Sequence, residues 1–149
     1  MTFRVSFNAS GLSRTLNSAS KDIHKKIVEA VNISVRDVQE RARAEHRFTS
    51  RTGQAEESIH TAVEEHGGKI VGMVYTSLPH AVYLHQGTKA HTIVPRAKEA
   101  LRWTDGKKFV FAKRANVSGI KADPYIFNAY EKEKTAIISR MDAIMKELK

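Results

Sequence analysis

Apolar residues recur at spacings of three and four between positions 23 and 42, which is the period of an amphipathic α-helix. The pattern predicts a helix from Ser20, which can serve as its N-cap, to about Arg47, roughly 40 Å long at 1.5 Å per residue. Its apolar stripe consists of Ile23, Ile27, Val28, Val31, Val35, Val38 and Ala42. The opposite face mixes Lys and Arg with Asp and Glu, so we interpret it as a solvated surface.

Alternating patterns predict strands on both sides of this helix. Residues 3–7 alternate apolar with polar side chains, which indicates a short strand with one buried face. Residues 59–65 and 69–77 follow the helix as two strands joined at Gly67-Gly68, a hairpin signal. The second of these strands is apolar on both faces, which carry Ile70, Gly72 and Val74 on one side and Val71, Met73 and Tyr75 on the other. We expect one face to pack on the helix and the other to meet something else, such as another subunit.

A second hairpin is predicted over Leu101–Lys113, with its turn around Asp105-Gly106. A two-residue Asp-Gly loop would place Trp103 opposite Lys108 and leave the two phenylalanines of the hairpin on the other face. A three-residue loop, Thr104-Asp105-Gly106, would instead gather the large apolar residues on one face, namely Leu101, Trp103, Phe109 and Phe111. Hydrophobicity favours the three-residue loop, and we expect the gathered aromatic residues to form core rather than a stacking platform for nucleic acid.

The last third of the pattern is helical again. Asp123-Pro124 predicts a helix start, with Asp123 as N-cap and Pro124 in the first turn. The apolar stripe that follows consists of Ile126, Ala129, Tyr130, Ile137, Met141, Ile144 and Leu148, broadened by Ile138 and Met145. The chain is therefore predicted to be one α+β domain over residues 1–149. We expect a long N-terminal helix, an antiparallel sheet of two hairpins, and a C-terminal helix packed on the sheet.

Charge is the most unusual feature of the composition. The 149 residues include 25 Lys and Arg against 16 Asp and Glu, a net charge of +9. About seven of these charges fall in one segment, whose cations are Lys89, Arg96, Lys98, Arg102, Lys107, Lys108, Lys113, Arg114 and Lys121. Such a balance suggests nucleic acid, an anionic surface or an acidic protein as the partner.

Several classes of protein are disfavoured by composition. The chain has no cysteine, which excludes disulfides, thiolate nucleophiles and Cys-bearing metal sites. No apolar run approaches the ~20 residues of a membrane span. The N-terminus lacks the apolar stretch of a signal peptide, so we expect neither a membrane location nor export.

Signals for catalysis are weak. His80, His85 and His91 fall within twelve residues and suggest a metal site as one alternative, but their spacing matches no standard zinc site. The chain has no Gly-x-Ser-x-Gly elbow, no P-loop and no Gly-x-Gly-x-x-Gly fingerprint. We therefore expect no enzyme activity, no metal and no cofactor.

Three blocks of the sequence together resemble one protein family. They are Thr52–Ile59, with its Thr-Gly and Ser-Ile pairs; Tyr83–Trp103, with Tyr-x-x-x-Gly-Thr followed by a proline and a Leu-x-Trp strand; and Gly119–Ile126, with Gly-x-x-Ala-x-Pro-aromatic. In order and spacing these blocks resemble the head–tail joining or tail-completion proteins of long-tailed bacteriophages, the minor tail protein Z-like group. The chain departs from the family at Gln54-Ala55, where a large apolar residue is common, and at Tyr125, where Phe is more common.

The resemblance implies a structural virion protein without enzyme activity. Its members are ring subunits of the phage neck, so a hexamer is expected here, assembled in the host cytoplasm and retained in the virion. Its partners would be the tail terminator, the tail tube or the head connector. The alternative is a basic nucleic-acid-binding module.

Interface residues can be proposed within that setting. A closed ring needs a heterologous interface, for which we select Val71, Met73, Tyr75, Tyr83, His85, Gly87 and Thr88. The basic segment between Lys89 and Lys121 would dock on acidic neighbours, with DNA in the lumen as a secondary contact. A lumen lined by cations that no protein partner neutralises would hold DNA tightly, because affinity for DNA rises with each phosphate charge that a cation neutralises.

Overall fold

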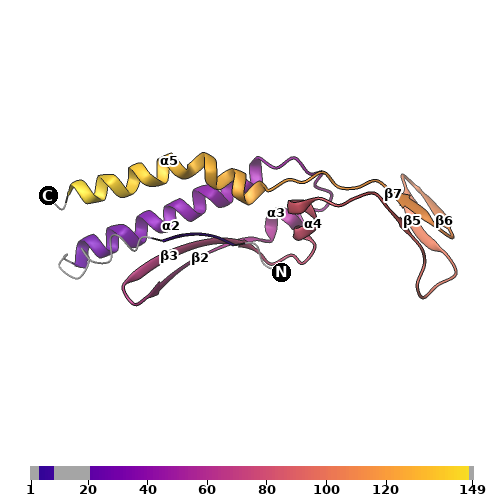
Figure 1. Cartoon of the computed structure of the whole chain (residues 1–149), viewed down its shortest axis with the longest axis horizontal. Coiled ribbons are helices and arrows are strands. Elements are labelled where there is room, and N and C mark those ends of the chain that lie inside the picture. Colours follow the sequence, from indigo (N-terminus) through magenta and orange to yellow (C-terminus); the bar gives the residue numbers. More distant parts are fainter. Residues whose placement is uncertain (1–3, 9–20, 148–149) are drawn as a thin grey trace.

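The computed structural model of the protein describes residues 4–8 and 21–147. It consists of a body and a projecting arm (Figure 1). The body contains two long helices, two short ones and an antiparallel sheet of order β1-β3-β2: α2 (Lys21–Ala44), α3 (Gln54–Glu57), α4 (Ala81–Gln86), α5 (Tyr125–Lys146), β1 (Arg4–Asn8), β2 (Ile59–His66) and β3 (Lys69–Thr76). The predicted α+β class, with a long N-terminal helix, antiparallel strands and a C-terminal helix, is confirmed.

The arm, residues 89–118, lies beyond the N-terminal end of α5 (Figure 1). It contains two separate two-stranded antiparallel sheets, formed by β4 (His91–Ile93) with β7 (Ala115–Val117) and by β5 (Leu101–Asp105) with β6 (Lys108–Ala112). The two predicted hairpins therefore exist, but they belong to different sheets. Only the β2–β3 hairpin joins the sheet of the body.

The core lies between α2, α5 and one face of the sheet. The predicted stripe of α2 is buried at Ile27, Val31, Val35, Val38 and Ala42. Complete burial of a side chain of this size contributes roughly 1.5–3 kcal/mol, which offsets the weak helix propensity of the Val-rich run. One end of α5 also reaches the sheet, in a cluster that includes Ile59, Val74, Tyr125 and Ile126.

Strand β3 has the two different faces that its sequence predicts. Ile70 and Val74 are buried in the clusters that include α2 residues. Val71, Met73 and Tyr75 alternate with them and therefore point away from the two long helices. Met73 is buried all the same, and the ring of Tyr75 lies 5.8 Å from that of His60 on the neighbouring strand.

The predicted end of the first long helix and the predicted start of the last one both need correction. Helix α2 ends at Ala44, three residues before Arg47, because the N–H groups of Arg47 and Phe48 turn toward the carboxylate of Asp123. Asp123 is consequently not the side-chain cap of α5, and Pro124 occupies the N-cap position with no side-chain hydrogen bond. The predicted cap Ser20 and the stripe residue Leu148 lie outside the described residues, as does Phe3 of the first strand.

The predicted loop of the second hairpin is wrong. Asp105 pairs with Lys108, so the loop consists of the two residues Gly106 and Lys107. Gly106 has φ 60°, as the first central position of a type II′ turn requires, and this turn matches the twist of the strands. The register places Trp103 opposite Val110, and Phe109 and Phe111 on the other face with Arg102.

The prediction that these aromatic residues form core is also wrong. Trp103 is 41% exposed, Phe109 62% and Phe111 65%. The reasoning behind the prediction assumed that the hairpin packs on the body. It projects in the arm instead, away from the helices that the structure describes (Figure 1).

Candidate interaction surfaces of the arm and its junction with the body

The arm joins the body where two backbone segments cross in close contact. Helix α4 ends at Gln86 with Gly87 as its C-cap, and the N–H of Thr88 donates to the carbonyl of Ile120 at 2.8 Å. In return, the N–H of Ile120 donates to Thr88 Oγ1 at 3.0 Å. We call Gly87-Thr88 and Gly119-Ile120 the junction, because the arm begins and ends there.

Both positions of the junction require glycine, because an added Cβ would clash with backbone atoms of the other segment. A Cβ at Gly87 would lie 2.5 Å from the carbonyl oxygen of Ile120, and φ is 74° at this residue. A Cβ at Gly119 would overlap the carbonyl oxygen of Thr88 and lie 2.9 Å from the carbonyl carbon of Lys89. Only residues without a side chain let the two segments approach this closely.

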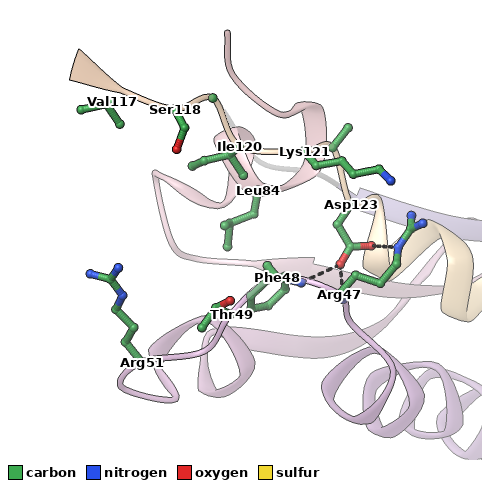
Figure 2. Close-up of a pocket in the computed structure, with 12 residues that line it drawn as sticks. Arg47, Phe48, Thr49, Arg51, Leu84, Val117, Ser118, Ile120, Lys121 and Asp123 are labelled. Atoms are coloured by element: carbon green, nitrogen blue, oxygen red, sulfur yellow. Dashed lines mark hydrogen bonds and ion pairs between the residues drawn. The ribbon is translucent and has the colours of Figure 1, made fainter. Parts of the chain in front are cut away.

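Asp123 ties the junction to the body (Figure 2). Its carboxylate is buried and accepts hydrogen bonds from the N–H groups of Arg47 at 2.5 Å and Phe48 at 3.3 Å. Its own N–H donates to the carbonyl of Leu84 at 2.9 Å. One residue thus connects the segment after α2, helix α4 and the start of α5.

A groove of about 570 Å³ lies beside this connection. Its lining combines apolar with cationic side chains, and includes Arg47, Phe48, Arg51, Leu84, Ile120 and Lys121. Phe48 is fixed by stacking on His46, with ring centroids 3.9 Å apart, and by an edge contact with Tyr125. Sequence reasoning did not select Arg47, Phe48 or Arg51, because nothing in the local pattern indicates that this loop meets residues 117–123.

The first resembling block has a structural place in the body. Gly53 takes φ 75° and precedes α3. Ser58, which ends α3, donates to the carbonyl of Ala55 at 2.7 Å, and its Oγ lies 2.8 Å from Thr76 Oγ1. The Ser-Ile pair thereby fixes the start of β2 against the end of β3.

All nine predicted basic residues are exposed on the arm or at its ends. Within residues 21–147, the ion pairs involve other residues, so no carboxylate neutralises these cations. Arg102 instead places its guanidinium carbon 4.9 Å from the ring centroid of Phe109. The positive charge of the arm is therefore available to a partner.

The residues selected for a subunit interface lie on the sheet, on helix α4, which carries Tyr83 and His85, and at the junction. Val71, Met73 and Tyr75 share the sheet face that points away from the helices. Tyr83 is 57% exposed on α4. Gly87 and Thr88 form hydrogen bonds or close contacts within the chain at the junction, so their nearest demonstrated role is intramolecular. Their selection as interface residues stays a prediction.

The three histidines of the basic region are on different elements. His80 precedes α4, His85 lies in α4, and His91 begins β4. Across the part of the chain that the structure describes, no group of three or more His, Asp or Glu residues could hold a metal ion. Burial lowers the pKa of His85, while the nearby charge of Asp123 acts in the opposite direction.

The lowered pKa of His85 predicts how the stability of the protein changes with pH. Because its pKa is lowered in the folded protein, the unfolded chain binds the proton more readily, and the contribution of neutral His85 is lost as pH falls below about 6.5. We expect His85→Gln to lose less stability than wild type between pH 7.5 and pH 5.5. Urea denaturation at both pH values measures this, with His80→Gln as the control for removing an exposed imidazole. Equal losses in wild type and His85→Gln would contradict it.

Comparisons with known proteins add no relative: no protein-family model matches the chain, and no curated protein or solved structure shows significant similarity to it. No helix among the described residues is long and apolar enough to cross a membrane.

Proposed function

We propose that this protein is a ring subunit of the neck of a long-tailed bacteriophage, where it completes the tail and joins it to the head. The observation that supports the proposal best is that its three resembling blocks meet in space. Ile59 of the first block, Leu84 of the second, and Tyr125 and Ile126 of the third belong to or pack against one core cluster. The second and third blocks also cross at the junction.

The arm gives a physical reason for assembly. An isolated two-stranded sheet is marginally stable in water, and exposed apolar patches commonly mark interaction sites. The β5–β6 hairpin exposes Trp103 on one face and Phe109 and Phe111 on the other. We therefore assign the Trp103 face of the arm to contacts with neighbouring subunits or neck proteins.

A closed ring also needs a second surface on each subunit that differs from the first. The β3 face with Val71, Met73 and Tyr75 is the candidate, because it points away from the helices of its own body and Val71 and Tyr75 on it are partly exposed, while Met73 is buried. The subunit would form a hexamer without catalysis or cofactor. It would contact the tail terminator, the tail tube or the head connector through acidic surfaces that match the arm.

The test is assembly in a phage whose genome encodes this chain. Interrupting the gene should give filled heads and complete tails that remain separate, and adding the purified protein to the lysate should restore joined, infectious particles. Joined and infectious particles in the absence of the protein would overturn the proposal.

An armless variant sharpens this test. A Cβ at Gly119 would lie 3.0 Å from the nitrogen of Ala90, so the two ends of the arm are adjacent and residues 91–117 can be replaced by a short Gly-Ser linker. We expect the body to keep its helical circular dichroism and to fail in restoring joined particles. If the armless protein restored joined particles to the wild-type level, the arm would be dispensable for joining.

A further inference from the structure

The arm contains a basic groove of about 670 Å³. Its lining is Pro95, Arg96, Ala97, Lys98, Ala100, Leu101, Arg102 and Phe111. The two acidic residues of the arm, Glu99 and Asp105, are not among the described residues that line it. The groove therefore offers three cations and one aromatic ring without a competing carboxylate.

The hairpin register fixes how the ring and the charges are arranged. Arg102 on β5 pairs directly with Phe111 on β6, so both side chains lie on one face. Phe109 lies two residues from Phe111 on the same face, roughly 7 Å away along the strand. Arg102 places its guanidinium carbon over the ring of Phe109, 4.9 Å from the ring centroid. Two exposed phenyl rings thus share one face of the hairpin with Arg102, and Phe111 also lines the groove with Arg96 and Lys98.

We propose that this face of the arm binds single-stranded nucleic acid. A nucleotide chain repeats a flat π-face and a negative charge, and proteins that hold single strands without sequence preference combine aromatic side chains with a positive groove. Phe111 and Phe109 would stack bases, while Arg96, Lys98 and Arg102 would contact phosphates. An acidic protein segment would satisfy the cations but would leave both phenyl rings without a matching partner.

The proposal does not depend on the phage ring. It concerns the Arg102–Phe111 face, whereas Trp103 on the other face of the hairpin remains available for protein contacts. The two proposals can consequently fail independently, since one is measured with purified protein and the other with particles.

The experiment is a titration of the full chain with fluorescein-labelled dT20 at 50 mM and higher salt. Binding is expected with a log–log salt slope of roughly −2, since three phosphate contacts each contribute about −0.7 on single strands. Phe111→Ala should weaken binding about ten-fold through loss of stacking. Phe127→Ala is the matched control, because Phe127 is an exposed phenylalanine on α5 of the body, and it should bind as wild type does.

A 20-base-pair duplex and a poly-glutamate peptide complete the test. We expect both to compete with dT20 less well than unlabelled dT20, because neither offers unpaired bases. Three results would overturn the proposal: no binding at 50 mM salt, equal binding of duplex and dT20 with no effect of Phe111→Ala, or equal competition by the acidic peptide. The last result would assign the groove to an acidic protein.

The integrity of the hairpin can be checked in each variant. Trp103 is the single tryptophan of the chain and lies on the opposite face from Phe111, so its emission reports whether the hairpin remains formed. If Phe111→Ala changes that emission, Phe111→Leu retains an apolar side chain without a π-face. It should then show the same loss of affinity, and wild-type affinity in a folded Phe111→Leu variant would contradict the stacking role.

Discussion

Replacement of Gly119 by alanine is expected to lower the free energy of unfolding by about 3 kcal/mol or more, the range of severe overpacking. The added Cβ would overlap the carbonyl oxygen of Thr88 and lie within 3.0 Å of the nitrogen of Ala90. These neighbours are backbone atoms, which cannot rotate aside as a side chain can. Relief therefore requires the two segments to separate, which breaks the hydrogen bonds between Thr88 and Ile120.

Gly68→Ala is the matched control for this prediction. Gly68 has φ 75°, and no described atom lies within 4 Å of the position its Cβ would occupy. Its substitution thus tests backbone strain without a clash, and should cost about 1–2 kcal/mol. Urea denaturation followed by circular dichroism compares the two variants. A loss for Gly119→Ala no larger than that for Gly68→Ala would mean that the junction can open without consequence.

The elements of the body could be predicted because each is set by local pattern. The stripe from Ile27 to Ala42 has the helical period, and Gly67-Gly68 has the left-handed geometry that closes the β2–β3 hairpin. The two faces of β3 follow from strict alternation. In these places, local pattern and tertiary packing favour the same structure, so sequence reasoning succeeds.

The arm shows where such reasoning fails. The grouping of apolar residues on one face predicts the register of a hairpin only if that face is buried within the same chain. The hairpin instead follows its turn, in which Gly106 takes the first central position, and exposes Phe109 and Phe111. Because the hairpin does not pack in the core that α2, α5 and the sheet form among the described residues, burial of an apolar face does not set its register.

The candidate sites were predictable in composition but not in geometry. Every cation assigned to the basic segment is exposed, as its sequence suggests. The groove of Arg96, Lys98, Arg102 and Phe111 depends on a loop that returns beside the hairpin, and the junction depends on two glycines 32 residues apart. No spacing rule links such positions. Asp123 likewise follows a local capping motif, yet a distant pair of N–H groups takes its carboxylate.

Asp123→Ala is the second substitution with a large expected effect, a loss of about 3 kcal/mol in the free energy of unfolding. Removing the carboxylate leaves the part-buried N–H groups of Arg47 and Phe48 without their acceptor, at roughly 1–2 kcal/mol for each donor. Asp123→Asn retains one oxygen acceptor but loses the charge that strengthens these bonds, so it should cost less, about 1–2 kcal/mol.

The order of three variants identifies which contacts of Asp123 matter. The side chain of Arg47 is largely exposed and its Nε lies 3.4 Å from Asp123 Oδ1, so Arg47→Ala should cost less than about 0.5 kcal/mol. Asp142→Ala, on the exposed surface of α5, is the control and should change stability by at most about 0.5 kcal/mol. Urea denaturation at pH 7.5 should therefore rank Asp123→Ala above Asp123→Asn, and both above Arg47→Ala. If Arg47→Ala were as damaging as Asp123→Ala, the carboxylate would act through the ion pair, and its proposed hold on the backbone after α2 would be wrong.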